Sequence, residues 1–373
     1  MKIALLAEIN ILKRKGVFDK IRDINTALQS LKEQASLFII SGDPVPQSSE
    51  NHFFCFRSSK SKVGDFIRKH ALLLRLRKAI AAFNPDIIIL RDTIYSPLIS
   101  FAIGNKPLII EINSDPYKEY RRSHWLEYLY FQLTQPLLYR KAFSFFCVTQ
   151  ELAEKPFIRR YNQPIKVAGN GIDCSRYAPR QPQPHDKPRL LFIGSPNQPW
   201  QGIEKAIVMA QCIPHFDFTL IGSSHASLPP NMHSRGYVAD DLILEQIISE
   251  CDAGIGTLNL SAKCLHEASP LKVRFYLACG LPVIIGYQDT DIRGEHAFVL
   301  QLGDGPDNVQ KNIARIRAFV INIRNSPRVR QQARDFAEKC LDVHKKEAEK
   351  LAFMKNLLAS RVAAKAALRT PAS

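Results

Sequence analysis

The stretch EASPLKVRFYLACGLPVI, residues 267–284, combines a helix start with two cations near the same end. Ser269 is a favourable N-cap and Pro270 suits the first helical position, so the next backbone amides would have no acceptor within the helix. Lys272 and Arg274 would lie where the helix dipole is already positive, which costs roughly 0.3–1 kcal/mol each. We therefore predict a site here for an anion such as a diphosphate.

Two residues complete this predicted site. Glu267 precedes the helix in a loop, where its carboxylate could accept hydrogen bonds from sugar hydroxyls. Leu271, together with Lys272, would present the first free amides to the anion. The same spacing also fits a plain surface helix that is capped by Ser269 and carries solvated cations, and the residues alone leave both alternatives open.

Two further loops follow predicted strands, and ligands of parallel α/β sheets bind outside the carboxyl ends of strands. The first, GSPNQPWQG at 194–202, suits a phosphate-facing turn although it contains neither a G-x-G-x-x-G fingerprint nor a P-loop. The second, EINSD at 111–115, would place Glu111 and Asn113 on one side of its strand. Asp115 could equally cap a helix.

The elements that would position these loops are short apolar runs alternating with longer helical patterns, which is typical of parallel sheets with crossover helices. In the first half the predicted strands are 3–7, 37–41, 53–56, 87–90, 108–112 and 143–148. The predicted helices between them are 18–34, 65–83 and 117–140. After a proline-rich stretch the alternation restarts at residue 189, and the chain looks helical from residue 306.

This organisation predicts an α/β protein with two Rossmann-like domains that face each other across a cleft. The expected boundaries are residues 1–168 for the first domain, 169–188 for a linker, 189–345 for the second domain and 346–373 for a C-terminal helix and tail. That last helix could lie on a membrane surface, but we expect it to pack on the body of the protein, because its apolar positions are mostly alanine and leucine.

The chain is unusually basic, since 51 Lys and Arg oppose 35 Asp and Glu, and residues 1–170 alone hold 26 against 15. The bias indicates an anionic partner, such as a membrane surface, a phosphorylated substrate or a nucleic acid, or merely a solvated basic face. No nucleic-acid-binding signature supports the third, so we expect no nucleic acid. The pattern at 68–83 fits either a peripheral membrane helix or a helix with a buried apolar face.

The cysteines and the hydropathy of the sequence indicate the cellular compartment of the protein. Eight scattered cysteines form no C-x-x-C pair, and we interpret the first ten residues as a strand and not as a signal peptide. No window supplies the ~20 apolar residues of a spanning helix. We therefore expect a cytoplasmic protein, with attachment to the inner face of the membrane as a further hypothesis.

Three segments, VAGNGID, FIGSPNQPWQG and EASPLKVRFYLACGLPVI, together resemble glycosyltransferase family 4, and so does IEINSD followed by KEY. This family has the two-domain GT-B fold. The resemblance covers nearly the whole chain and implies a retaining, hexosyltransferase-like glycosyltransferase of polysaccharide biosynthesis. The first domain would bind a cell-envelope glycan or lipid-linked acceptor and the second a UDP- or GDP-sugar donor, with no cofactor and no metal ion.

The resemblance also assigns roles to residues. Glu267 matches the first glutamate of the family's E-x7-E motif, which contacts the donor sugar, and the amides from Ser269 to Lys272 match the cradle of the donor diphosphate. The second glutamate, which binds the ribose, is replaced by Phe275. Asn113 stands where the family has a cleft histidine, so Glu267 and Asn113 are our predicted catalytic residues.

Other positions depart from the family. The family usually has an arginine and a lysine that bind the donor diphosphate, and the positions nearest to these two are occupied here by Ser195 and Gln201. We expect Lys272 and Arg274 to supply the missing positive charge. Gly16, in a KRKG loop, would approach the donor when the domains close. His124 could replace the missing histidine but falls inside a predicted helix, where a structural role is favoured. These departures leave one alternative, a catalytically degenerate GT-B binding or scaffold protein.

Overall fold

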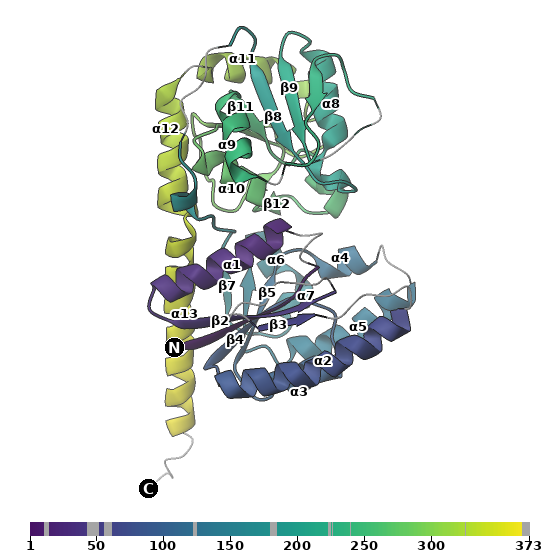
Figure 1. The fold of residues 1–373 in the computed structure, drawn as a ribbon, viewed down its shortest axis with the longest axis vertical. Helices are drawn as coiled ribbons and strands as arrows, with labels where there is room; N and C mark the ends of the chain where they lie inside the picture. The colour runs from purple at the N-terminus through teal and green to yellow at the C-terminus, as the bar shows by residue number, and fades with distance from the viewer. Residues whose placement is uncertain are drawn as a thin grey trace. The chain divides into compact units, whose positions relative to one another are not determined.

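The computed structural model describes residues 1–10, 15–42, 52–55, 62–121, 125–179, 185–222, 225, 227–238, 240–324 and 326–367. They form two compact units, each built around its own parallel sheet (Figure 1). Unit 1 comprises Met1–Cys147, Leu152–Ala168 and Val343–Ser373, and unit 2 comprises Val148–Glu151 and Gly169–Asp342. The C-terminal segment, which we expected as a separate helix and tail, thus belongs to unit 1.

Unit 1 contains a seven-stranded parallel sheet in the order β3-β2-β1-β4-β5-β6-β7. Its strands are β1 (Lys2–Glu8), β2 (Gln34–Ser41), β3 (His52–Cys55), β4 (Ile87–Arg91), β5 (Leu108–Ile112), β6 (Ser144–Cys147) and β7 (Ile165–Val167). Strands β1, β2, β4 and β5 are buried on both faces, which explains why they appear in the sequence as continuous apolar runs.

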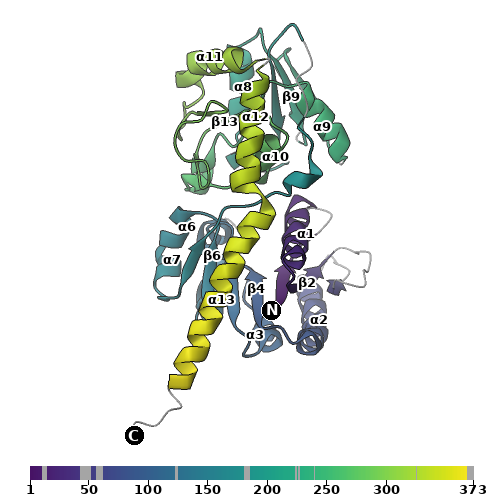
Figure 2. The same ribbon diagram turned by 90° about the vertical axis from the view of Figure 1, so that its left-hand side faces the viewer.

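Helices cover both faces of this sheet. They are α1 (Lys15–Ser30), α2 (Lys62–Phe83), α3 (Pro97–Ile103), α4 (Pro116–Tyr120), α5 (Trp125–Tyr139), α7 (Pro156–Arg159) and α13 (Val343–Ala367), while α6 (Gln150–Glu154) spans a unit boundary. Right-handed crossovers place α1 on one face and α2, α3 and α5 on the other. Val343, Leu351 and Met354 of α13 join the core cluster of α1 and β1 (Figure 2), so the expectation that this helix packs on the body is confirmed.

The segment 68–83 lies within α2, and the structure favours the second of its two alternatives. Leu73, Leu76 and Ile80 are each at most 2% exposed, so α2 packs its apolar side inside unit 1. Among the helices in the described ranges, none is both long and apolar enough to cross a bilayer.

The single helix predicted at 117–140 is wrong, because the structure has two helices there. Asp115 caps α4 by accepting a hydrogen bond from the Lys118 amide at 3.2 Å, with Pro116 in the first turn. The cap alternative for Asp115 is thus confirmed. Residues 122–124 between α4 and α5, including His124, lie outside the described residues.

Unit 2 contains a six-stranded parallel sheet in the order β10-β9-β8-β11-β13-β15 and a small β12-β14 pair. The strands are β8 (Arg189–Ile193), β9 (Asp217–Ile221), β10 (Met232–Ser234), β11 (Ala253–Ile255), β12 (Glu267–Ala268), β13 (Val283–Ile285), β14 (Gln288–Asp289) and β15 (Val299–Gln301). The helices are α8 (Ile203–Cys212), α9 (Asp241–Ser249), α10 (Leu271–Ala278), α11 (Ile313–Ile323) and α12 (Pro327–Phe336). Short 3-10 turns are η1 (Cys174–Arg176), η2 (Pro199–Gln201), η3 (Leu260–Lys263) and η4 (Gln310–Asn312), and η5 (Ala337–Leu341) is a π-helical turn.

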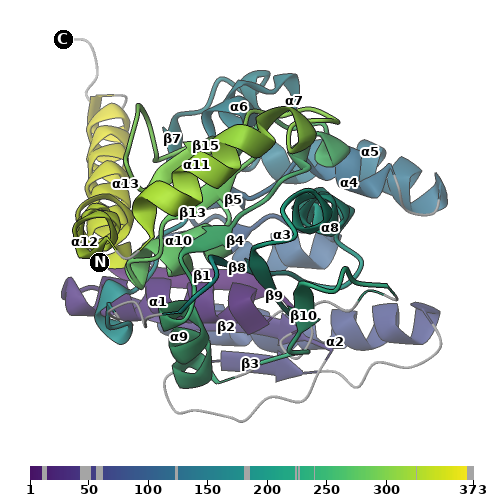
Figure 3. The same ribbon diagram turned by 90° about the horizontal axis from the view of Figure 1, so that it is seen from above.

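The core of unit 2 lies between this sheet and helices α8 and α11, with α9 on the opposite face (Figure 3). Helix α10 connects β11 to β13, and both strands run in the same direction. Its first turn therefore lies at the carboxyl edge of the sheet, next to the loop that follows β8.

The predicted linker, 169–188, is in fact ordered against unit 2 over residues 169–179. Ile172 pairs with Asp342 in a short parallel bridge. The guanidinium of Arg334 donates to the carbonyls of Cys174 at 2.8 Å and Tyr177 at 2.6 Å. These contacts make the stretch after residue 168 part of the framework that carries α10.

Candidate active site

The helix start of the EASPLKVRF stretch differs from its prediction by one residue. Pro270, not Ser269, is the N-cap residue of α10, and the Val273 amide donates to the Pro270 carbonyl at 3.2 Å. Ser269 is buried and its hydroxyl instead accepts from the Asn170 amide at 2.6 Å. The amides of Leu271 and Lys272 therefore remain at the positive end of the helix.

The contact with Asn170 joins two of the three segments that carried the family resemblance. Asn170 belongs to VAGNGID, and its side-chain amide also donates to the Ser269 carbonyl. Gly169 has no room for a side chain, since an added Cβ would lie 2.9 Å from the Ser269 hydroxyl and 2.0 Å from Asp291 Oδ2. The glycine and asparagine of VAGNGID and the serine of EASPLKVRF therefore pack directly against each other.

Arg274 does not serve the predicted anion site, and this is a correction. Its side chain is fully buried, and its guanidinium pairs with both oxygens of Asp289 and, at 2.6 Å, with Asp291. Burial alone would lower its pKa, but the Asp289 carboxylate and then Asp291 raise it. Its Nε also donates to the Asn170 carbonyl at 3.2 Å, so Arg274 ties α10 to two neighbouring loops.

Lys272 is the cation that remains at the helix start. Its Nζ donates to the Ile193 carbonyl at 3.0 Å and lies 4.1 Å from the centre of the Phe192 ring, at the end of β8. Desolvation by burial lowers its pKa from 10.5 to about 7. No carboxylate in the described part of the chain forms an ion pair with it. Lys272 is thus a half-buried, partly desolvated lysine beside two helix amides and the strand-end loop.

Glu267 lies in β12 and is 8% exposed. Its carboxylate accepts from the Glu151 amide at 2.7 Å, while the Glu151 carboxylate accepts from the amides of His266 at 2.8 Å and Glu267 at 3.0 Å. The two glutamates therefore hold each other through backbone amides. Sequence reasoning missed Glu151, whose signal was only its place just after a strand.

Two hydrogen bonds of Gln201 fix the loop after β8. The Gln201 side chain accepts from the Ser195 amide at 2.9 Å, and the Gln201 carbonyl accepts from the Leu258 amide at 3.1 Å. Gly202 has a φ of 80°, and an added Cβ would lie 2.9 Å from Leu258 Cβ, so the glycine permits this close approach. The structure thus brings the predicted residues Ser195 and Gln201 together, with the Gln201 oxygen directed at the backbone.

Phe275, at the position of the family's ribose-binding glutamate, packs against another aromatic ring. Its ring meets that of Tyr177 edge-on with centroids 5.0 Å apart. Tyr177 follows η1 in the ordered part of the predicted linker. The aromatic at this position therefore anchors the linker segment in place of a carboxylate.

In unit 1, Glu111 and Asn113 contact the same buried lysine. This agrees with the prediction that both side chains lie on one side of their strand. Lys20 of α1 donates to Glu111 at 3.0 Å and to Asn113 Oδ1 at 2.8 Å. Desolvation lowers the Lys20 pKa to about 8, although Glu111 opposes the shift. We did not predict a role for Lys20. Its spacing from Ile24 and Ala27 places it on the buried face of α1, and this spacing could have indicated a buried lysine.

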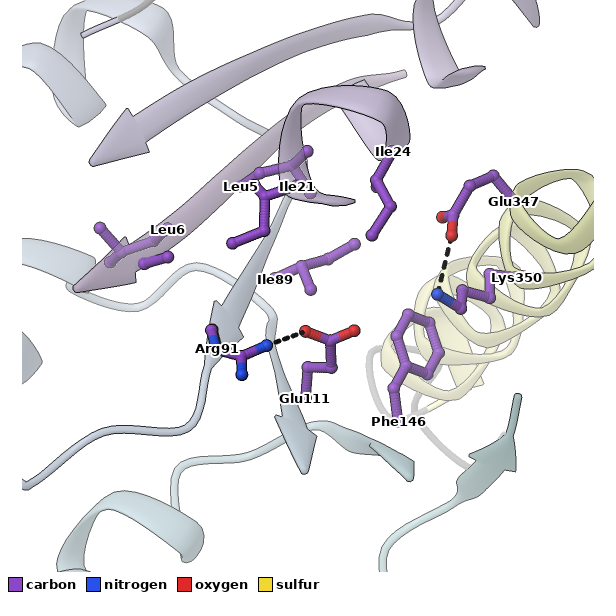
Figure 4. A pocket seen from close by; sticks show the side chains of 11 residues that line it. Leu5, Leu6, Ile21, Ile24, Ile89, Arg91, Glu111, Phe146, Glu347 and Lys350 are labelled. Atoms are coloured by element: carbon purple, nitrogen blue, oxygen red, sulfur yellow. Dashed lines mark hydrogen bonds and ion pairs between the residues drawn. The ribbon is translucent and has the colours of Figure 1, made fainter. Parts of the chain in front are cut away.

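A small cavity lies beside Glu111, with a volume of about 20 Å³, which is enough for one water molecule (Figure 4). Aliphatic side chains of β1, α1 and β4 line it together with Arg91, Glu111, Glu347 and Lys350. Burial would raise the Glu111 pKa, but Lys20, then Lys350 and Arg91, lower it below its ordinary value. This cluster keeps Glu111 ionised, so Glu111 fixes the lysine that holds Asn113.

Gly16 is not in a loop, which corrects its prediction. It is the second residue of α1, exposed, with nothing within 4 Å of an added Cβ. A side chain would therefore fit here. Lys13 and Arg14 of the same KRKG stretch lie outside the described residues.

The predicted site residues divide between the units. Gly16 and Asn113 belong to unit 1, and Glu267, Ser195, Gln201, Ser269, Leu271, Lys272, Arg274 and Phe275 belong to unit 2. In the ranges that the structure describes, no group of three or more His, Cys, Asp or Glu side chains is placed to hold a metal ion.

Comparisons with known proteins agree with the family resemblance. Residues 21–176 match the family described as Glycosyltransferase Family 4. No curated protein matches the sequence.

Solved structures share the fold along nearly the whole chain. Sucrose-phosphate synthase from Thermosynechococcus elongatus has a TM-score of 0.70 at 15% identity, covering 96% of this chain and 100% of its own. HepE from Anabaena, in complex with UDP and glucose, has a TM-score of 0.68 at 16% identity, covering 95% and 100%. The lipopolysaccharide outer core galactosyltransferase WaaB has a TM-score of 0.64 at 14% identity, covering 95% and 100%. The predicted GT-B fold is confirmed.

Proposed function

We propose that the chain, which has a GT-B fold and whose residues 21–176 match the family described as Glycosyltransferase Family 4, is a glycosyltransferase that moves a sugar from a nucleotide-diphosphate sugar to a cell-envelope glycan or lipid-linked acceptor. The donor would bind to unit 2 and the acceptor to unit 1. HepE, which has this fold, is described in complex with UDP and with UDP-glucose, which supports a UDP-sugar as the first donor to test.

The observation that carries the proposal is Lys272 at the start of α10. An ammonium that loses solvent without gaining a carboxylate is destabilised, and its lowered pKa reports that cost. A diphosphate placed at the amides of Leu271 and Lys272 would supply the missing negative charge. The site is thus arranged to stabilise charge that develops on a departing diphosphate.

Glu267 would bind the donor sugar. One of its carboxylate oxygens is held by the Glu151 amide, which fixes the side chain and leaves the other oxygen to accept from a sugar hydroxyl. During transfer the bond from the anomeric carbon to the diphosphate breaks and a bond to the acceptor oxygen forms on the same face of the sugar. The proton of the acceptor hydroxyl passes to the diphosphate, so the reaction balances.

In this mechanism we expect no metal ion, because Lys272 and the helix amides carry the leaving-group charge. We also expect Asn113, held by Lys20, to act on the acceptor side. Arg274 has no place in this mechanism, because its buried pairs with Asp289 and Asp291 occupy it.

A thermal-shift panel tests the proposal, with UDP, GDP and ADP and a sugar conjugate of each. Stabilisation grows as RT ln(1 + [L]/Kd), so at 100 times Kd the binding nucleotide adds about 2.7 kcal/mol. The best nucleotide sugar is then incubated with the protein, and release of free sugar or nucleoside diphosphate is followed. A flat response to every nucleotide contradicts the donor site. Binding without any sugar release would instead favour the degenerate binding protein, for which Phe275 against Tyr177 is the supporting contact.

A further inference from the structure

Helix α5 exposes large apolar side chains along its length. The exposed fractions are 66% for Trp125, 53% for Leu126, 44% for Leu129, 39% for Tyr130, 68% for Leu133 and 45% for Leu137. We call these six residues the α5 face. Their spacing of one, three and four residues places them on one side of the helix, while Phe131 and Leu138 are buried on the other.

A helix that is apolar all round is usually buried, whereas α5 buries only one side. Between Trp125 and Tyr139 the sequence has a single charged residue, Glu127. The six exposed side chains therefore form a continuous apolar surface of a kind that marks an interaction site in water-soluble proteins.

The neighbouring helices extend this surface. The Tyr130 hydroxyl donates to the Tyr95 carbonyl at 3.0 Å, which joins α5 to the segment that leads into α3. Phe101 of α3 is 45% exposed, and the Arg77 guanidinium of α2 lies 3.7 Å from its ring centre. Figure 1 shows α2, α3 and α5 together on one side of the sheet of unit 1.

Cations accompany the apolar surface. Arg75, Arg77 and Lys78 of α2 are exposed, and Arg140 and Lys141 are exposed directly after α5. No acidic residue occurs between residues 68 and 83. An apolar face with tryptophan and tyrosine and a rim of cations has the composition of surfaces that lie in the headgroup region of a bilayer.

We propose that the α5 face docks unit 1 on an anionic lipid bilayer. The aromatic and leucine side chains would enter the boundary between headgroups and acyl chains, and the cations of α2 and those after α5 would meet the lipid phosphates. The exposed cations of α2 and those after α5 favour a lipid surface as the partner. A second copy of this chain is disfavoured, because two surfaces with this positive charge would repel each other. This docking does not depend on the donor site.

Co-sedimentation of the full chain with vesicles tests the proposal. Vesicles of phosphatidylcholine with phosphatidylglycerol should bind it, pure phosphatidylcholine vesicles much less, and added salt should weaken the binding. The triple variant Leu129→Gln, Leu133→Gln and Leu137→Gln should bind about tenfold more weakly or worse, because each leucine removed takes apolar area from the bilayer. Equal binding of this variant would overturn the proposal.

Leu242→Gln is the matched control. Leu242 lies on α9 in unit 2 and is 67% exposed, close to the 68% of Leu133, so this variant should bind vesicles like the parent chain. The thermal shift with UDP should stay unchanged in the triple variant, which separates a failure of docking from a failure of the donor site. A dimer that dissociates on the triple substitution, without vesicle binding by the parent chain, would contradict a lipid partner.

Fluorescence gives a second readout, since Trp125 and Trp200 are the only tryptophans of the chain. In a Trp200→Phe variant, emission comes from Trp125 alone and should shift to the blue with anionic vesicles and be quenched by brominated acyl chains. In the reciprocal Trp125→Phe variant, emission from Trp200 should not respond. A Trp125 signal that ignores vesicles would contradict insertion of the α5 face.

Discussion

Lys272 and Arg274 lie two residues apart on α10 and have opposite surroundings. Arg274 is enclosed by the carboxylates of Asp289 and Asp291, so its charge is neutralised inside the protein. Lys272 is partly desolvated, and among the described residues its ammonium contacts only a carbonyl and a ring face. We therefore expect the charge of Lys272 to destabilise the unliganded fold and to become favourable when an anion binds beside it.

Replacing Lys272 by methionine should stabilise the unliganded protein. The folded pKa of about 7 lies below the unfolded value of 10.5, so the unfolded state binds more protons between these values and stability rises with pH across this window. Lys272→Met should flatten that rise and add on the order of 1 kcal/mol at neutral pH. Thermal denaturation from pH 6 to 10 measures both effects, and a lower melting temperature at every pH would contradict them.

Replacing Arg274 by methionine should instead destabilise the unliganded protein. Asp289 would be left buried without its partner, which costs about 3–5 kcal/mol. Adding Asp289→Asn should recover part of the loss, because the uncompensated charge disappears. Denaturant unfolding measures both variants, with the exposed Arg315→Met as control. If Arg274→Met leaves stability unchanged but abolishes nucleotide binding, Arg274 is a donor-binding residue and this account of it is wrong.

At the scale of elements, β12 and α10 are shaped by contacts from distant segments. Ser269 and Pro270 have the types of a cap and a first helical residue, yet the helix starts one position later because Asn170 takes the Ser269 hydroxyl. Glu267 is likewise held by Glu151, which precedes it by 116 positions in the chain. Local propensity predicts that a helix starts here, but it cannot predict which residue a distant amide claims.

Two substitutions of Glu267 separate its structural from its chemical part. Glu267→Gln keeps an oxygen for the Glu151 amide and should cost less than about 0.5 kcal/mol of stability, whereas Glu267→Ala leaves that amide without an acceptor and should cost roughly 1–3 kcal/mol. Both should lose sugar transfer. Thermal unfolding and donor turnover are measured side by side, and full turnover by Glu267→Gln would refute a role at the sugar.

For the whole molecule, burial on both faces made the central strands predictable, because such strands appear as uninterrupted apolar runs. The short strand β10 and the division between α4 and α5 were missed, because both depend on tertiary context. The alternation of strands and helices was enough to predict two α/β units. It could not predict that the chain would end by returning to unit 1 as α13, because sequence order does not set which sheet a last helix covers.

The same limit applies to the candidate site. Residue types predicted a helix start within one residue of that of α10 and placed Glu111 and Asn113 on one side of their strand, and both predictions depend on local spacing. They did not reveal that Arg274 is internally paired or that Lys20 and Glu151 hold the predicted residues, because those contacts join positions far apart in sequence. The basic charge of the first half indicated an anionic partner but did not predict that α5 exposes an apolar face.

The central claim is that α10 and Lys272 bind the diphosphate of a nucleotide-sugar donor. Isothermal titration of the unmodified chain, Lys272→Met and the control Lys311→Met with UDP and GDP tests it most directly, since Lys311 is a solvent-exposed lysine of the same unit. We predict that one nucleotide binds the parent chain and the Lys311 variant equally and the Lys272 variant at least tenfold more weakly, a loss of about 1.4 kcal/mol or more. Equal affinity for all three proteins, or no binding of any nucleotide, would contradict the account.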